Sequence, residues 1–328
     1  MKLTRRDFLT RTGTVALAVG LSPALSPRPT SGQTAVKFGT AVLGDYSLIA
    51  PIIVGMEKGF FKENGVAAEF TPFRGGPDLL KAVQANQIQI GITGSTDVPV
   101  FRSRGVPIRC IAVTVNSNHF TFNVAPGISK LDEIKGKSIG VTVVGASTWV
   151  FANMLAKRQG WDPQRDVKIV PLGGLDAQLA ALTRGETHAF VWGDGGAMLE
   201  LQGKSRVLLR LDAVTPKWFS QAVYCTDDYI KGNKDAIRRA VRGLFQGVKF
   251  IRESSPEAIK ITAKTLGWPE EGVARAHQQI SGPLFNPDGR IDVEALRVMR
   301  DTLIEYGVIK ERVPVEDHYT DEFTPVRV

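Results

Sequence analysis

Residues 73–99 run FRGGPDLLKAVQANQIQIGITGSTDVP and predict a short buried strand between two helices. The strand is IQIGIT at 88–93, because this run is short, rich in isoleucine and bounded by polar turns. A helix is expected before it at 77–85, where proline takes the first helical position, and another after it at 97–104. Such alternation is typical of a parallel or mixed sheet covered by helices.

The alternation continues on both sides of this segment. Before this segment we expect strands at 36–40 and 67–71 and a helix at 47–61. After it we expect a strand at 108–115. A second set follows, with strands at 120–125, 138–143, 167–170, 188–192 and 207–211 and helices at 147–159, 175–184 and 196–202. After Phe219 come one strand and then amphipathic helices at 234–253, 256–266, 269–281 and 292–306.

This order predicts an α/β protein of two lobes. The helical tail has no sheet of its own to cover, so we expect it to pack on the first lobe. The first lobe would then comprise residues 36–117 and 217–328, and the second residues 118–216, with two crossings of the chain between them.

The chain starts with a twin-arginine pattern, Thr4-Arg5-Arg6-Asp7-Phe8-Leu9. The weakly apolar run behind it, 13–25, has about 13 residues, whereas a bilayer span needs roughly 20. Residues 1–35 are therefore predicted to be a twin-arginine export signal, cleaved between 26 and 35, and the rest is expected in the periplasm, folded before it crosses the membrane. The alternative is a chance Arg-Arg pair in a surface helix.

Composition excludes several classes of protein. With 43% hydrophobic and 23% charged residues, the chain is neither disordered nor a multi-span membrane protein. Residues 1–35 hold five of the 41 basic side chains and one of the 33 acidic ones, which leaves 36 against 32, a net charge of +4. A charge this small, without a Lys/Arg cluster, argues against nucleic acid as a partner and is compatible with a small anionic ligand.

Cysteine and histidine are few and scattered. No spacing among them suggests a metal site, and we expect no cofactor. Cys110 and Cys225 both lie in apolar, strand-like runs, so they are either two buried thiols or, in an oxidising compartment, a disulfide. No nucleophile and base order or paired carboxylate set stands out, which favours a protein that is not an enzyme.

Five segments in a fixed order resemble the substrate-binding proteins of ABC importers, in the branch that binds sulfonates, taurine, nitrate and thiamine precursors. They are GFFKENGV (59–66), FRGGPDLLKAVQANQIQIGITGSTDVP (73–99), LDEIKGKSIGVTVVGAST (131–148), DAQLAALTRGETHAFVW (176–192) and SSPEAIKITAKTLG (254–267). The resemblance implies a type II periplasmic binding protein fold, a small-molecule ligand between the lobes and a hinge motion on binding. It also implies docking on an ABC permease at the inner membrane, and neighbouring strands for Cys110 and Cys225, which could then be bridged. We expect a monomer.

The chain departs from the family pattern at two places. Family members often have Trp-Asp/Glu-Pro after the last strand of the second lobe, whereas this chain has Trp192-Gly193-Asp194-Gly195-Gly196. The first loop carries an acid, Asp45, which an anion binder would turn away from its ligand. Both departures leave the identity of the ligand open.

The candidate site consists of the turns at the carboxyl ends of strands, where helix N-termini favour negative charge. Glycine and hydroxyl side chains there could hold a sulfonate or carboxylate with neutral donors, although each turn could equally be only a turn and helix cap. Arg74 is the one cation in these turns, as an anion clamp or a solvated charge. The predicted ligand-binding residues are Asp45, Tyr46, Arg74, Gly75, Gly94, Ser95, Thr96, Gly145, Ser147, Thr148, Gly174 and Trp192.

The leading hypothesis is therefore an extracytoplasmic carrier of a small anionic organic solute. The alternative ligand is a pyrimidine-type thiamine precursor or another aromatic solute, stacked on Tyr46 and Trp192 and donating to Asp45 or Asp194. Other classes are a pyrimidine synthase, which would need a cysteine-rich motif, and a ligand-sensing partner of a signalling receptor.

Overall fold

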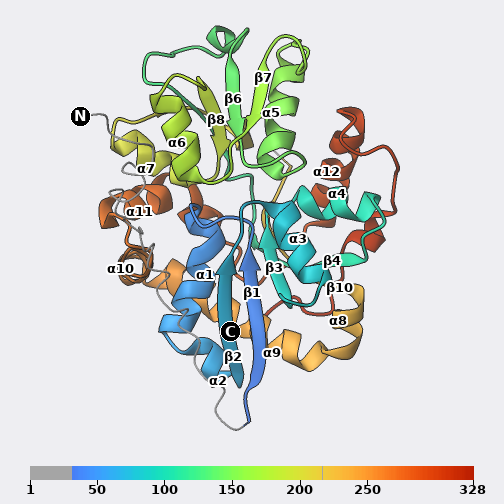
Figure 1. Ribbon diagram of the computed structural model, residues 1–328. Coiled ribbons are helices and arrows are strands. Elements are labelled where there is room, and N and C mark those ends of the chain that lie inside the picture. The colour runs from blue at the N-terminus through green and yellow to red at the C-terminus, as the bar shows by residue number, and fades with distance from the viewer. Residues whose placement is uncertain (1–31, 216) are drawn as a thin grey trace, which may run out of the picture.

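The computed structural model describes residues 32–215 and 217–328, which fold into two α/β lobes stacked one above the other in Figure 1. The predicted export signal, 1–35, lies outside the described residues except for 32–35. Strand β1 (Thr34–Thr40) already begins inside that predicted signal, where Thr34 and Ala35 pair with β2.

The first lobe is built on a sheet with strand order β2-β1-β3-β10-β4, in which β10 runs antiparallel to both of its neighbours. The other strands are β2 (Val66–Pro72), β3 (Ile90–Thr93), β4 (Ile108–Val115) and β10 (Ser220–Thr226), with helices α1 (Tyr46–Glu57), α2 (Phe60–Glu63), α3 (Gly76–Gln84) and α4 (Asp97–Ser103). The single helix predicted at 47–61 is in fact two, because Gly59 adopts a left-handed conformation with φ of 78° and breaks the helix.

The second lobe repeats this plan with strand order β7-β6-β8-β5-β9, where β5 is the antiparallel member. Its strands are β5 (Thr121–Val124), β6 (Ser138–Val141), β7 (Lys168–Pro171), β8 (Ala189–Trp192) and β9 (Arg206–Arg210), and its helices are α5 (Ser147–Arg158), α6 (Leu175–Thr183) and α7 (Gly195–Leu201). The chain crosses between the lobes twice, from β4 to β5 and from β9 to β10. The predicted α/β fold of two lobes is confirmed.

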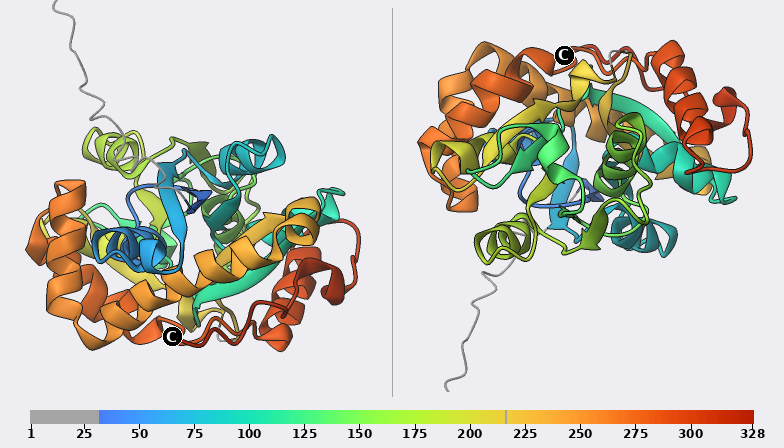
Figure 2. Two further views of the ribbon diagram at one scale, coloured as in Figure 1. Left: turned by 90° about the horizontal axis from the view of Figure 1, so that it is seen from below. Right: turned by 90° about the horizontal axis from the view of Figure 1, so that it is seen from above.

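The C-terminal third is helical and lies along one side of the molecule in both views of Figure 2. It contains α8 (Asp227–Gly232), α9 (Lys234–Glu253), α10 (Ser255–Leu266), α11 (Glu270–Ala276) and α12 (Val293–Glu305). As predicted, this tail packs on the first lobe, since α9 and α10 both contact α1; α11 in addition packs on α7 of the second lobe. None of the helices in the described ranges is long and apolar enough to cross a bilayer.

The helix predicted at 269–281 changes its winding near its end. Residues His277–Ser281 form a π-helical turn after α11. Because a π turn widens the helix by one residue per turn, such turns are uncommon and are not signalled by hydrophobic spacing.

The two cysteines lie on adjacent strands, as the resemblance implied, but they are free, buried thiols. On β4 and β10, Cys110 is opposite Tyr224, whereas Cys225 is opposite Arg109. Successive side chains of a strand point to opposite faces, so this one-residue offset puts the two thiols on different faces of the sheet. The structure therefore corrects the possible disulfide.

We predict that Gly247→Ala destabilises the protein. Helix α9 crosses α1 so closely at Gly247 that an added Cβ would overlap the backbone oxygen of Pro51. Overpacking of this kind lowers the free energy of unfolding by about 1–3 kcal/mol, measurable as a lower Tm. The control is Gly232→Ala at the end of α8, where nothing lies within 4 Å of the added Cβ; equal Tm values for the two variants would contradict the close crossing.

We also predict that protein exported to an oxidising compartment, once unfolded without reductant, titrates two thiols. The native protein should react slowly, because burial raises the pKa of the Cys110 thiol to about 12 and only the thiolate is nucleophilic. A count of no free thiols would show that the strands shift enough to form the bridge.

Candidate functional site

A small cavity lies between the lobes where loops from both sheets meet. The first lobe contributes the loops that follow β1, β2 and β3, and the second lobe those that follow β6 and β8. The first crossing contributes Phe120, and the start of β10, just after the second crossing, contributes Gln221. The volume of the cavity is about 30 Å³, room for roughly one or two water molecules. The two lobes therefore lie in close contact around this cavity.

Half of the predicted ligand-binding residues line this cavity. They come from both lobes, which the prediction required: Asp45, Gly75 and Gly94 from the first, and Ser147, Thr148 and Trp192 from the second. Trp192 is a wall of the cavity and donates from Nε1 to the backbone oxygen of Gly44 at 2.6 Å, so it also joins the two lobes.

Three predicted residues are buried beside the cavity without lining it. The Tyr46 ring turns into the first lobe, where it contacts His277 and Phe285 edge to face. The Ser95 hydroxyl donates to a backbone oxygen, that of Phe219, at 2.6 Å. The Thr96 hydroxyl donates to Ser147 Oγ at 2.5 Å, which is a contact between the lobes. Tyr46 is therefore a core residue here and not a stacking surface.

The other three predicted residues lie further out. Arg74 is exposed and does not line the cavity, which favours the solvated charge over the anion clamp. Gly145 adopts a φ of 85° in the turn before α5, a conformation that glycine supplies without strain. Gly174 is exposed at the start of α6, the position of a helix cap.

The prediction missed several residues that line the cavity, chief among them Asp97, Phe120 and Gln221. Asp97 directly follows the predicted turn at 93–96 and begins the next helix. Its position beside that turn could therefore have identified it as a site residue from the sequence. Phe120 and Gln221 carry no local signal, because only the path of the two crossings brings them to the cavity.

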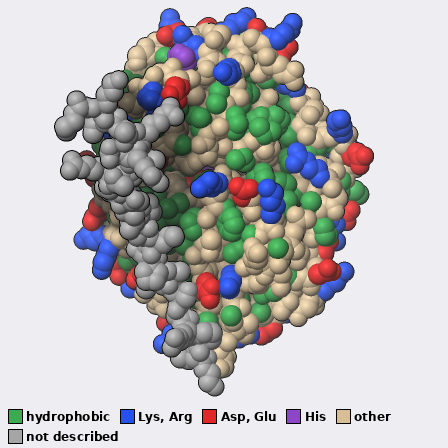
Figure 3. All heavy atoms as spheres, in the orientation of Figure 1, with side chains coloured by type: hydrophobic (Ala, Val, Ile, Leu, Met, Phe, Trp, Pro, Cys, Tyr) green, Lys and Arg blue, Asp and Glu red, His purple; other side chains and the backbone are tan. Residues whose placement is uncertain are grey.

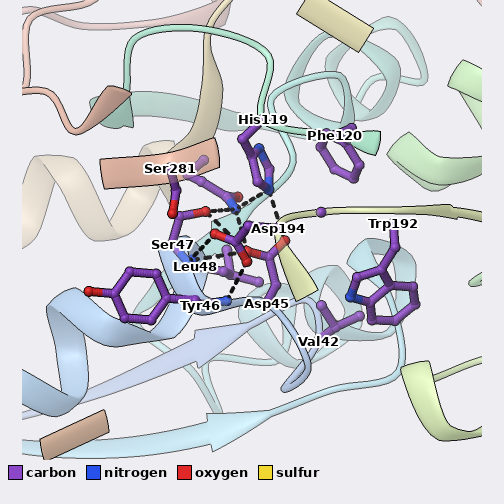
Figure 4. A network of polar contacts seen from close by, with 12 residues as sticks. Val42, Asp45, Tyr46, Ser47, Leu48, His119, Phe120, Trp192, Asp194 and Ser281 are labelled. Atoms are coloured by element: carbon purple, nitrogen blue, oxygen red, sulfur yellow. Dashed lines mark hydrogen bonds and ion pairs between the residues drawn. The ribbon is translucent and has the colours of Figure 1, made fainter. Parts of the chain in front are cut away.

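A buried polar network adjoins the cavity at the start of α1 (Figure 4). Asp45 caps this helix, accepting from the Leu48 backbone at 3.3 Å and from the Ser47 hydroxyl at 3.1 Å. Its second oxygen lies 2.9 Å from Nε2 of His119, a residue of the first crossing. The side-chain nitrogen of Gln221, from the second crossing, donates to Asp45 at 3.3 Å and to the Ser47 hydroxyl at 3.2 Å.

The second lobe adds a carboxylate to the same helix start. Asp194, which is fully buried, accepts from the backbone N–H of Tyr46 at 2.7 Å and from that of Ser47 at 2.8 Å. Figure 4 shows the carboxyl groups of Asp45 and Asp194 on one side of the helix start, and the Tyr46 ring pointing away from them.

Burial and close charges shift the pKa values in this network. Burial and the neighbouring Asp45 carboxylate together raise the pKa of Asp194 to about 7, against a partial lowering by His119 and hydrogen bonds. For Asp45, burial acts in the same direction, but the attraction of His119 and hydrogen bonds outweigh it and hold the pKa below its usual range. His119 shows the converse, since Asp45 raises its pKa above the ordinary value in spite of burial. Asp45 and His119 thus form an ion pair.

Asp97 faces the second lobe from the opposite side of the cavity. The hydroxyl groups of Thr93 and Ser147 both donate to its carboxyl group, the latter at 3.1 Å. Burial raises the pKa of Asp97 to about 7, against a partial lowering by these hydrogen bonds. Near neutral pH the group therefore exchanges between a carboxylate that accepts and an acid that donates.

The arrangement is suited to holding a solute by hydrogen bonds. Residues at helix starts, four hydroxyl groups and two carboxyl groups line one small cavity with two aromatic rings in its wall. Within the described part of the chain, no group of three His, Cys, Asp or Glu side chains is placed to hold a metal ion.

Asp97→Asn is predicted to flatten the dependence of stability on pH. The carboxyl group has a pKa of about 7 in the folded protein and an ordinary value of 3.8, so between these pH values the folded state keeps a proton that the unfolded chain has lost. The free energy of unfolding therefore falls as pH rises through this window, by at most about 1.4 kcal/mol per pH unit for one group, and levels off above it. Tm measured against pH should fall less steeply in the variant than in wild type. Asp176→Asn, at an exposed site, is the control; identical slopes for wild type and Asp97→Asn would contradict the assignment.

Comparison with known proteins places this geometry in a family. The family described as NMT1/THI5 like matches residues 47–258. A putative binding protein of Brucella abortus is 22% identical over 331 residues, covering 98% of this chain and 99% of the relative. The taurine-binding periplasmic protein of Escherichia coli is 30% identical over 148 residues, 44% of this chain and 45% of the relative. A yeast 4-amino-5-hydroxymethyl-2-methylpyrimidine phosphate synthase is 20% identical over 64% of this chain and 65% of its own.

Solved structures share the fold. The alkanesulfonate-binding protein SsuA of Xanthomonas axonopodis, bound to MOPS, superposes with a TM-score of 0.75 at 16% identity, covering 89% of this chain and 100% of the other. The nitrate-binding protein NrtA of Synechocystis reaches 0.65 at 14% identity, over 89% and 92%. These likenesses show a periplasmic binding protein fold, and with the match over most of the sequence the chain belongs to the NMT1/THI5-like family.

Proposed function

We propose that this protein is the extracytoplasmic solute-binding component of an ABC importer and that it captures a small anionic organic solute between its lobes. The observation that carries the proposal is the cavity between the lobes, at the carboxyl ends of strands in both sheets. A solute that contacts both walls favours the closed state, which a permease can then distinguish from the open one.

The hydrogen-bond donors in the cavity carry no formal positive charge, yet they favour an anion. Gly75 and Gly76 lie at the start of α3, and Ser147 and Thr148 begin α5, so two helix starts line the cavity from opposite lobes. Asp97 is compatible with an anion when protonated, because a carboxylic acid donates a hydrogen bond, and its pKa of about 7 makes that form accessible at neutral pH.

Relatives support a solute of this class. Proteins named for binding taurine, alkanesulfonates and nitrate are similar to this chain, and sulfonate and nitrate are small oxyanion groups. The same names support a carrier in preference to an enzyme, although a pyrimidine phosphate synthase and a desulfurization enzyme are also similar to this chain.

A pyrimidine-type or other aromatic solute is the second candidate. The rings of Phe120 and Trp192 and the carboxyl groups of Asp45 and Asp97 line the same cavity, which would suit stacking and donation from ring amines. Measured turnover of such a compound would instead favour a synthase-like enzyme.

The remaining parts of the proposal follow from the sequence pattern and the fold. Residues 1–35 are a twin-arginine signal that sends the protein to the periplasm, residues 36–117 with 217–328 and residues 118–216 are the two lobes, and a monomer docks on the permease. Nucleic acid is no part of the proposal: on the face shown in Figure 3, basic and acidic side chains are interspersed and do not form a patch of one sign.

The test is to identify the solute and measure its binding. Mass spectrometry of the protein under native conditions identifies what co-purifies, and thermal shift with alkanesulfonates, taurine, nitrate and aminopyrimidines then ranks the classes. A ligand at 100 times its Kd stabilises the folded state by about 2.7 kcal/mol, so a true ligand raises Tm clearly. A rise in Tm with aminopyrimidines alone would overturn the proposal of an anionic solute. If none of the tested compounds raises Tm, the whole set of candidate solutes is overturned.

Ser147→Ala is predicted to weaken binding of the identified anion about tenfold, a loss of about 1.4 kcal/mol, because Asp97 loses the hydroxyl that donates to it and leaves a less compensated carboxylate beside the anion. Calorimetric titration measures the Kd, and Ser129→Ala, on the exposed surface of the same lobe, should leave it unchanged.

In cells, uptake of the labelled solute should stop when the protein is deleted; uptake at the wild-type rate would contradict the importer role.

A further inference from the structure

We propose that Asp194, in its ionised form, is a built-in anion: it occupies the N-terminus of α1 in place of an external one and holds the lobes together when no solute is bound. The inference rests on the proposed function in one respect, since it concerns closure of that same cleft. It assigns a role to the sequence Trp192-Gly193-Asp194-Gly195-Gly196, where the family pattern is not kept.

The geometry is that of a bound oxyanion. Each oxygen of the Asp194 carboxyl group accepts from a different backbone N–H at the start of α1, from Tyr46 at 2.7 Å and from Ser47 at 2.8 Å. α1 has 12 residues, so its first N–H groups carry the partial positive charge that attracts anions. The carboxylate reaches these N–H groups from the other lobe. Asp194 lies 148 residues after Tyr46 and 147 residues after Ser47 in the chain.

The helix does not need this second carboxylate as a cap. Asp45 already caps α1 through the Leu48 backbone N–H, and it is itself paired with His119. Two carboxyl groups at one buried helix start repel each other, which is costly for the fold. A residue that only stabilised α1 would not need to come from the opposite lobe, so the link between the lobes is what distinguishes Asp194.

The chain around Asp194 is shaped for close approach. A Cβ at Gly193 would overlap the Asp45 carboxyl group, and one at Gly195 would overlap the backbone oxygen of Gly44. Glycine on both sides of Asp194 thus lets the loop after β8 lie directly against the loop after β1.

A matching contact exists across the cavity in the opposite sense. Asp97 of the first lobe accepts from Ser147 at 3.1 Å, at the start of α5 in the second lobe, and the Ser147 backbone N–H also stabilises this carboxylate. A carboxyl group of each lobe therefore reaches the helix start of the other. Both links join the lobes at the rim of a cavity of about 30 Å³.

Closure without a solute changes how the site selects ligands. The start of α1 is not open to external anions while Asp194 occupies it. An anionic solute is therefore restricted to the start of α3 and to that of α5, where it has to share the donors with Asp97. Removal of the Asp194 carboxylate should both weaken closure and expose a new anion site. These two consequences can be measured without knowing the solute.

The first measurement is the shape of the solute-free protein. Wild type and Asp194→Ala are unfolded, dialysed and refolded to remove any co-purified ligand, and small-angle scattering is recorded. Wild type should match the closed structure, and Asp194→Ala should have a larger radius of gyration at unchanged helix content. Asp176→Ala, an exposed acid on α6 of the same lobe, is the control and should match wild type. Equal radii for wild type and Asp194→Ala would overturn the proposal.

The second measurement is rescue by an external anion. Sodium formate, compared with sodium chloride at equal ionic strength, should raise the Tm of Asp194→Ala and restore its compact scattering, because formate can occupy the vacated helix start. Formate should give wild type and Asp176→Ala no shift beyond that of chloride. If Asp194→Ala does not fold without formate but folds with it, the proposal is supported; if formate affects it no more than wild type, the built-in anion is refuted. If Asp194→Ala folds in neither salt, Asp194→Asn, of the same shape, replaces it in the scattering measurement, where equal radii again refute the link.

The outcomes separate this inference from the proposed function. An open Asp194→Ala protein that formate closes would support the built-in anion even if no solute were ever found. A protein that binds a sulfonate tightly but keeps the same shape with and without the Asp194 carboxylate would support the carrier and refute the link.

Discussion

Backbone N–H groups that no helix can satisfy internally organise the interior between the two lobes. Parallel strands end at the same edge of a sheet, and the helices that follow them begin there. In this protein, these edges of the two sheets face each other. The starts of α1, α3 and α5 therefore meet in one small space. Whatever fills that space must supply acceptors, and in the closed structure the carboxyl groups of Asp194 and Asp97 do so.

Burying these carboxyl groups has consequences for charge. Asp45 and His119 compensate each other as a buried pair, whereas Asp97 has only neutral donors as direct partners and keeps a pKa of about 7. A group with that pKa can lose or gain a proton when a solute of either polarity arrives. The cleft therefore adapts its charge more easily than a site built on a fixed Lys or Arg would.

Local patterns predicted most of the elements. Strand β4 and helix α9 have the predicted bounds, because β-branched runs and apolar residues at helical spacing are strong signals over such lengths. The prediction was wrong where one residue changes the backbone, as at Gly59 between α1 and α2, or where winding changes late in a helix, as at His277–Ser281. For Cys110 and Cys225 the sequence left buried thiols and a disulfide both open, and a one-residue difference in register, which puts the two on different faces, decides for the thiols.

The sequence by itself determined the two-lobed α/β fold, the family, and the turns from which a site could be built, because these depend on short-range periodicity and on glycine and hydroxyl residues at strand ends. Which of those turns face the cavity was decided only by the tertiary structure. Tyr46 and Trp192 look alike as aromatic residues beside strand ends, yet one turns into a core and the other forms a wall. Asp194 meets Tyr46 and Ser47 only because two chain crossings bring distant segments together, and no local pattern encodes the position of one lobe against the other.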